Sequence, residues 1–176
     1  MGLRGCGKST LGRLLAEGLG RPLVEIDEQI LATFPEASVA EVWAANGEAA
    51  WRAAETRVLC ECLQRAGQVI ALGGGTPMIP EARHLIEAEQ RASRATVIYL
   101  RCRVAELTHR LLKNPGDRPP LLAGDAIKEI ARVAQMRQPA YRSLADIELD
   151  VTETTPAEAA TVILRLLNHG HGPNDG

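Results

Sequence analysis

Short apolar runs alternate along the chain with segments in which apolar residues recur every three or four positions. Four runs have the length and composition of buried strands, and they cover Leu23–Asp27, Gln68–Leu72, Ala95–Leu100 and Ile147–Val151. Helical periodicity characterises the segments between them, which begin at Lys8 and then cover residues 28–34, 48–63, 80–92, 104–113, 126–141 and 155–167. Strands that alternate with helices of this length predict an α/β protein with a parallel sheet covered by helices.

Local signals mark where some of these elements begin and end. Ser38 followed by Glu41 has the form of a capping box and predicts a helix start, and Thr155-Pro156 predicts the start of the last helix. Asn114–Pro120 breaks regular structure, so residues 111–125 are predicted to form a lid over a site. We expect one domain over residues 1–167, followed by a disordered tail over residues 168–176.

The first ten residues, MGLRGCGKST, have the spacing of a phosphate-binding P-loop that opens a helix. Glycines allow successive backbone N–H groups to face one anion, and the start of a helix adds its positive dipole end. Lys8 is predicted to reach the β- and γ-phosphates, Ser9 to bind Mg²⁺ and Thr10 to share the capping. The remaining predicted phosphate contacts are Gly5, Cys6 and Gly7. Cys6 is interpreted as a small filler, with a redox-sensitive thiol as the alternative.

Composition narrows the classes of function. Hydrophobic residues make up 45% of the 176 positions, charged residues make up 24%, and the formal net charge is −2. These values are ordinary for a globular protein and argue against a surface that binds nucleic acids or membranes in general. The sequence shows neither a signal peptide nor an apolar run long enough for a membrane span, and its four cysteines form no C-x-x-C pair. We therefore expect a cytoplasmic protein.

Further candidate site residues lie where the predicted strands end. Glu25 and Asp27 close the first apolar run, and Gly73–Gly75 follows the second, where three glycines imply a close approach of the backbone. An ordinary acidic helix start is the alternative for Asp27. Arg52 lies three residues before Glu55 on a helix, where a surface salt bridge is the alternative to a functional pair. Together with Arg118 and Arg137, Arg52 is suited to bind a carboxylate or phosphate. A P-loop, a lid and nearby acids are typical of phosphoryl transfer.

On these motifs the sequence resembles the shikimate kinase family from Gly2 to about Leu167. The matching segments are GLRGCGKST, Glu25-Ile26-Asp27 at an Asp-x-Asp motif, Gly47–Glu55 at G-E-x-x-[FW]-R-x-x-E, Gly73–Gly75, Arg118–Leu122 at R-P-L-L, and Arg137–Tyr141 at R-x-P-x-Y. The resemblance implies ATP-dependent phosphorylation of the 3-hydroxyl of shikimate, with Mg²⁺. It also implies a three-layer P-loop kinase fold with a parallel five-stranded sheet in the order 2-3-1-4-5, and we expect a monomer without nucleic-acid or membrane partners.

The resemblance also implies roles for individual residues. Asp27 is expected to bind shikimate hydroxyls and accept the reacting proton, and Lys8 and Arg118 to act on the transferred phosphate. Arg52 and Arg137 are expected to bind the shikimate carboxylate, and Gly73, Gly74 and Gly75 to face the substrate. Trp43 and Trp51 are expected either to form an apolar wall beneath the shikimate ring or to pack in the protein core. Adenine is expected near Arg110 and Pro156, and the metal near Ser9 and Glu25.

Three features depart from the family pattern. Glu25 replaces the first Asp, which shifts a metal-orienting carboxylate by about one bond length. An extra proline interrupts the lid motif at Pro119-Pro120. Only Met1 precedes the P-loop, so the first strand is expected to be missing from the centre of the sheet, between the strands at residues 69–72 and 96–100. On that basis we expect low stability and weak ATP binding.

Two other functions remain open from the sequence. One is another P-loop small-molecule kinase, such as a gluconate kinase, although the carboxylate-binding segments argue against it. The other is a non-catalytic shikimate-kinase-like ligand sensor, which the Glu25 replacement and the missing strand favour.

Overall fold

The computed structural model describes residues 1–113 and 126–169. Within these residues the strands and helices alternate as predicted. In chain order they are α1 (Lys8–Leu19), β1 (Leu23–Glu25), α2 (Ile26–Leu31), α3 (Val39–Leu63), β2 (Val69–Ala71), the 3-10 helix η1 (Thr76–Met78), α4 (Pro80–Arg91), β3 (Ile98–Arg101), α5 (Val104–Lys113), α6 (Ala126–Leu144), β4 (Ile147–Asp150) and α7 (Pro156–His169). None of the described helices combines the length and apolar character required to cross a bilayer.

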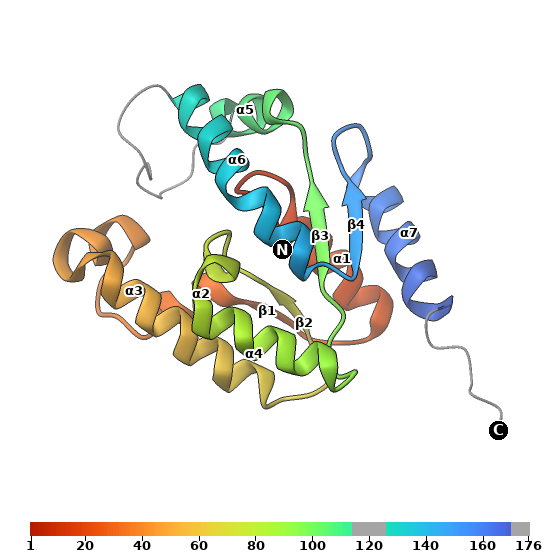
Figure 1. Cartoon of the computed structure of the whole chain (residues 1–176), viewed down its shortest axis with the longest axis horizontal. Helices are drawn as coiled ribbons and strands as arrows, with labels where there is room; N and C mark the ends of the chain where they lie inside the picture. Colours follow the sequence, from red (N-terminus) through yellow and green to blue (C-terminus); the bar gives the residue numbers. More distant parts are fainter. Residues whose placement is uncertain (114–125, 170–176) are drawn as a thin grey trace.

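The sheet is divided into two parallel pairs. β1 pairs with β2, with Leu23 opposite Val69, and β3 pairs with β4, with Ile98 opposite Ile147. Figure 1 shows the two pairs separated, with the amino terminus close to β3. This arrangement is the predicted strand order with its central position interrupted, and it agrees with the α/β P-loop kinase fold. The prediction of a gap between residues 69–72 and residues 96–100 therefore matches the described chain.

Helices cover both faces of these strand pairs. α1 packs against β2 and α7, whereas α3 packs against α2 and α4 (Figure 1). The largest fully buried side chains of the common core include Trp51, Tyr99 and Tyr141. Burial of large apolar side chains is the main favourable contribution to the stability of such a core.

Local capping signals mark the starts of α3 and α7. Ser38 Oγ accepts a hydrogen bond from Glu41 N at 3.2 Å, and Glu41 Oε2 accepts one from Ala37 N at 2.9 Å. These contacts confirm the capping prediction for α3. A second box caps α7, where Thr155 Oγ1 accepts a hydrogen bond from Glu158 N and Glu158 Oε2 accepts one from Thr155 N.

Some boundaries differ from the prediction. The strand predicted over Leu23–Asp27 ends at Glu25, and Asp27 lies in the first turn of α2. Carboxylates are favoured in a first turn because they interact with the helix dipole, and this preference overrides the extended pattern. α3 is one element kinked at Gly47, where φ is 79° and ψ is 164°. The predicted lid (residues 111–125) and the predicted tail (residues 168–176) begin inside helices, because α5 continues to Lys113 and α7 to His169; the rest of both segments lies outside the described residues.

Candidate active site

The P-loop forms a glycine-rich turn at the start of α1. Gly7 adopts a left-handed conformation with φ 94° and ψ 20°, and its carbonyl accepts the first helical hydrogen bond, from Leu11 N. Lys8 Nζ donates hydrogen bonds to Gly2 O at 3.1 Å and Leu3 O at 3.0 Å. The turn therefore has the backbone form that an anion site requires, with an ammonium group held against it. Cys6 is 2% exposed, which fits a small filler.

Arg110 links the P-loop to the loop between β4 and α7. Its Nε donates to Glu106 Oε1 at 2.7 Å, and its Nη2 donates to Val151 O at 3.1 Å. The Nη1 group reaches Gly5 O at 3.5 Å. The structure thus places Arg110 beside the phosphate loop and beside the turn that leads to Pro156, and the contact of these two residues with adenine stays a prediction.

The Gly73–Gly75 run is the point at which the predicted substrate residues meet. A Cβ atom added at Gly73 would lie 2.6 Å from Glu55 Oε1 and 2.9 Å from Asp27 Oδ1. A Cβ atom at Gly75 would lie 2.3 Å from Arg52 Nη1. Side chains at these positions would overlap the functional groups, so the three glycines allow Asp27 and Arg52 to approach the backbone after β2.

Arg52 is oriented by two carboxylates of unequal burial. Its Nη1 contacts Glu55 Oε2 at 2.8 Å, and its Nη2 contacts Glu48 Oε1 at 2.8 Å. The Glu55 side chain is 1% exposed, so this pair is not the surface salt bridge that the sequence left open. Burial lowers the pKa of Arg52, but the ion pairs with Glu55 and Glu48 outweigh it and raise the pKa above its usual value. The guanidinium is therefore a fixed cation.

Arg137 and Tyr141 join α6 to the same glycine run. Arg137 Nη1 donates to Gly74 O at 3.0 Å, and the Tyr141 hydroxyl donates to the same oxygen at 2.6 Å. Desolvation raises the pKa of Tyr141 well above its usual value, so the hydroxyl remains a donor at neutral pH. The two arginines predicted to bind a carboxylate thus contact adjacent segments of one glycine run, from α3 and α6.

Thr76 is a site residue that the sequence analysis did not identify. Its side chain is fully buried, and its hydroxyl donates a short hydrogen bond to Glu55 Oε1. Glu55 therefore accepts a hydrogen bond from Thr76 on one carboxylate oxygen and a hydrogen bond from Arg52 on the other. A polar residue directly after the glycine run was the available signal, but its partner is 21 positions away in the sequence.

The two tryptophans have different environments. Trp51 is 1% exposed and stacks on Phe34, with ring centroids 6.2 Å apart. It belongs to the core, as the packing alternative proposed. Trp43 is half-buried, and the Arg52 guanidinium lies 5.8 Å from its ring centroid, so Trp43 is the tryptophan beside the candidate substrate site.

Glu25 is the candidate metal-orienting carboxylate at the end of β1. Its Oε1 atom is buried and has no hydrogen-bond partner within residues 1–113 and 126–169. A buried carboxylate oxygen of this kind fits a cation or a cation-bound water. The described residues contain no group of three or more His, Cys, Asp or Glu side chains able to hold a metal ion. Mg²⁺ would accordingly take its other ligands from Ser9, phosphate oxygens and water.

One predicted catalytic residue has no described position. Arg118, with the rest of its motif up to Leu122, lies outside the described residues. Three other predicted residues, Asp27, Arg52 and Arg137, lie at the glycine run, and a Cβ atom added at Gly74 would lie 3.3 Å from Gly2 O of the P-loop.

The comparisons with known proteins all point to the same family. The profile of the family "Shikimate kinase" matches residues 4–168. The chain is 36% identical to a shikimate kinase of Stenotrophomonas maltophilia over 94% of its own length and 89% of the relative's, and 34% identical to one of Rhodopirellula baltica over 99% and 91%. Its structure is similar to that of a shikimate kinase from Acinetobacter baumannii in complex with shikimate, with TM-score 0.87 and 28% identity over 98% of this chain and 92% of the other.

Proposed function

Because the chain belongs to the shikimate kinase family, we propose that it transfers the γ-phosphate of ATP to the 3-hydroxyl of shikimate, giving shikimate 3-phosphate for aromatic amino acid biosynthesis. The protein is an ATP-dependent kinase of a small molecule. The observation that carries the substrate assignment is the convergence of Arg52, Arg137 and Asp27 on Gly73–Gly75, next to the P-loop. Two cations beside a hydroxyl-binding acid suit a carboxylate-bearing polyol better than a neutral sugar.

Each group has a part in phosphoryl transfer that follows from its position. Arg52 and Arg137 bind the carboxylate, and this contact orients the ring so that one hydroxyl faces the P-loop. Asp27 accepts the proton that this hydroxyl loses as its oxygen bonds to the γ-phosphorus, while the bond from that phosphorus to the β–γ bridging oxygen breaks and ADP leaves. Lys8 exchanges its loop carbonyl contacts for the β- and γ-phosphate oxygens and stabilises their charge. Arg118 is assigned to the transferred phosphate from its motif.

Mg²⁺ completes the proposed site. When bound, it would neutralise phosphate charge during transfer, held by Ser9 and oriented through Glu25. Residues 111–125, which include Arg118, are assigned as the lid from their sequence. We further propose that the protein acts as a monomer in the cytoplasm, in keeping with its free cysteine thiols.

An ADP-release assay tests the function directly. We expect ADP formation that depends on both Mg·ATP and shikimate, and no stimulation by gluconate or other sugar acids. Turnover with gluconate and not shikimate would support the alternative kinase. Calorimetric binding of shikimate without any turnover would support the non-catalytic sensor and reject the proposed reaction.

The carboxylate clamp is tested by Arg137→Ala, with Arg132→Ala as the matched control, because Arg132 is exposed on the same helix. We expect Arg137→Ala to raise the shikimate KM by about tenfold or more while changing the ATP KM little, which corresponds to a lost charged hydrogen bond. Arg132→Ala should leave both constants unchanged. Equal increases in the two KM values for Arg137→Ala would reject the clamp.

A further inference from the structure

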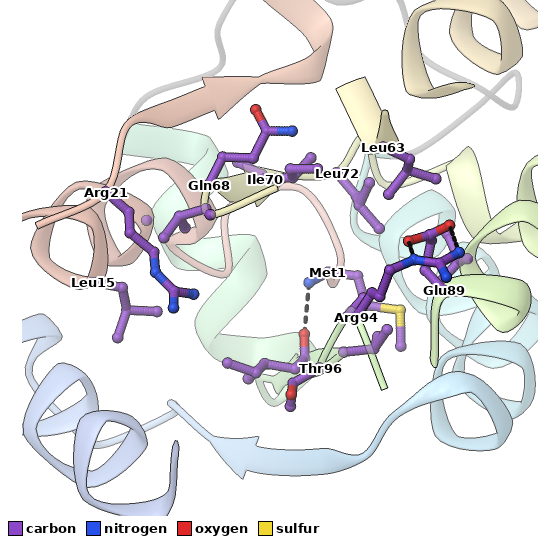
Figure 2. A pocket seen from close by; sticks show the side chains of 18 of the residues that line it. Met1, Leu15, Arg21, Leu63, Gln68, Ile70, Leu72, Glu89, Arg94 and Thr96 are labelled. Carbon is purple, nitrogen blue, oxygen red and sulfur yellow. Dashed lines mark hydrogen bonds and ion pairs between the residues drawn. The ribbon is translucent and has the colours of Figure 1, made fainter. Parts of the chain in front are cut away.

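The chain leaves β2 through Leu72 and enters the glycine run Gly73–Gly75. Leu72 lines a cavity of about 1020 Å³ between β2 and β3. Figure 2 shows Met1 in this cavity, with Leu72 on one side and Thr96, which precedes β3, on the other. The pairing of β1 with β2 ends at Ala71, so the glycine run lies beyond the strand ladder and its backbone groups are bonded to other elements.

The three carbonyl groups of the run have different partners. Backbone N–H groups of η1 donate to two of them, at 3.2 Å to Gly73 O and at 2.9 Å to Gly75 O. Gly74 O instead accepts hydrogen bonds from α6, from the Tyr141 hydroxyl at 2.6 Å and from Arg137 Nη1 at 3.0 Å. Gly74 is buried, and a buried carbonyl that loses its partners is destabilising. The place of the middle carbonyl therefore depends on side chains of α6.

Tyr141 is suited to hold this carbonyl whether or not a ligand is bound. Its side chain is fully buried, and its ring packs on that of Tyr99 with centroids 5.1 Å apart, which restricts the direction of the hydroxyl. Burial raises the pKa of the hydroxyl further than the charge and hydrogen bonding of Arg137 lower it. The hydroxyl therefore keeps the proton that Gly74 O accepts. Arg137 is only half-buried and carries the groups proposed to bind a carboxylate.

The local structure of α6 brings both side chains to the glycine run. Arg137 lies four residues before Tyr141, so the two side chains project from the same face of the helix. Pro139 lies between them and has no N–H, so this turn lacks one helical hydrogen bond. Arg83 of α4 contacts the same region, with Nη1 3.4 Å from Ala140 O. A contact that does not involve the Tyr141 hydroxyl thus also restrains the helix.

We propose that Tyr141 is a positioning residue for the shikimate carboxylate, an inference that rests on the function proposed above. Its hydroxyl holds the Gly74 carbonyl in place, and that carbonyl holds Nη1 of Arg137, so that the rest of the guanidinium is directed to the substrate. A carbonyl oxygen has two lone pairs and can accept both hydrogen bonds together. Because Arg137 is ordered before the ligand arrives, less entropy is lost on binding.

Tyr141→Phe tests the proposal because it removes the hydroxyl and keeps the ring. We expect the shikimate KM to rise about tenfold, while kcat and the ATP KM change by less than about twofold. Tyr99→Phe is the matched control, since it removes a hydroxyl from the adjacent ring, whereas Gly74 O bonds to Tyr141. The control should leave all three constants unchanged.

Coupling to Arg137 separates positioning from a general loss of packing. In an Arg137→Ala background, Tyr141→Phe should raise the shikimate KM by less than about twofold, because the group that it positions is absent. An equal factor in the two backgrounds would overturn the proposal. Equal increases in the shikimate and ATP KM values for Tyr141→Phe would overturn it as well, because they would indicate a structural role alone.

Calorimetric titration with shikimate distinguishes a failure of this proposal from a failure of the proposed function. We expect Tyr141→Phe to weaken shikimate binding about tenfold. Unchanged affinity in this variant, with shikimate-dependent ADP release intact in the wild type, would overturn the positioning role alone. If the wild type releases no ADP in response to shikimate, the proposed function is rejected, and the calorimetric comparison still decides whether Tyr141 positions Arg137.

Discussion

Glu55 shows how one buried carboxylate orders the predicted substrate clamp. Its two carboxylate oxygens accept hydrogen bonds from Thr76 and Arg52, and its side chain is almost completely excluded from solvent. A buried charge of this kind is tolerated because both oxygens are satisfied. Arg52 is consequently held in one orientation before a ligand arrives, which reduces the entropy lost on binding.

Thr76→Val removes one of these hydrogen bonds while keeping the shape of the side chain. We expect the shikimate KM to rise about tenfold, because Glu55 then lacks a buried partner and Arg52 is less well held. The ATP KM should change little, and Thr76→Ser should restore the wild-type value. Steady-state kinetics with each substrate varied separately measures the effect. A fall in kcat with an unchanged shikimate KM would contradict this positioning role.

Glu25→Gln tests the carboxylate at the end of β1. If Glu25 orients Mg²⁺, we expect the Mg²⁺ concentration for half-maximal rate to rise about tenfold, with activity largely recovered at high Mg²⁺. Glu28→Gln is the matched control, since Glu28 is exposed on α2 and should leave the requirement unchanged. Identical Mg²⁺ titrations of the two variants would remove Glu25 from the metal site.

α3 is the element that sets the geometry of the clamp. Its kink at Gly47 separates the turn carrying Trp43 from the turns carrying Arg52 and Glu55. The kink allows Arg52 to lie beside the Trp43 ring while pairing with Glu48 and Glu55. A straight helix would place these side chains according to the 3.6-residue period alone.

Gly47→Ala should therefore affect both stability and substrate binding. The φ of 79° combined with ψ of 164° is accessible mainly to glycine. We therefore expect the free energy of unfolding to fall by about 1–3 kcal/mol and Tm to fall by several degrees. The shikimate KM should also rise. Ala45→Gly is a nearby control for the loss of helix propensity. It should lower the free energy of unfolding by about 1 kcal/mol without changing the shikimate KM. Thermal unfolding and kinetics of the two variants separate the effects.

In the whole molecule, the candidate site spans the two strand pairs. Asp27, Gly73–Gly75 and the α3 clamp belong to the β1–β2 side, whereas Arg110 bonds to the loop after β4. Arg137 and Tyr141 of α6 connect to Gly74 across the molecule. The relative position of the two pairs thus sets the site.

The buried amino group of Met1 makes stability depend on pH. Its pKa is about 5 in the folded chain and near 8 when unfolded, so the unfolded state binds the extra proton between these values. Stability is then fully present above pH 8 and lost as pH falls toward 5, by about 4 kcal/mol. Urea unfolding at several pH values measures this slope. In a chain acetylated at Met1, the slope should decrease, and an unchanged slope would contradict the assignment.

Patterns that depend on neighbouring residues were readable from the sequence. The P-loop turn, the Ser38–Glu41 box and the Arg52–Glu55 pair each follow from spacing within one turn or helix, where geometry is local. The alternation of strands and helices likewise predicted the fold class, and the strand order that the family resemblance implies predicted where the sheet is interrupted. The family resemblance added the roles of Arg110 and Arg137.

The tertiary structure determined the features that join distant segments. Local pattern extended the first strand to Asp27, but the chain enters α2 after Glu25. Thr76 is paired with Glu55, and Tyr141 with Gly74, by packing between elements far apart in the sequence. The cavity beside Met1 likewise depends on how two strand pairs and four helices meet. Hydrophobic periodicity specifies which face of an element is buried, whereas these contacts depend on which element it is buried against.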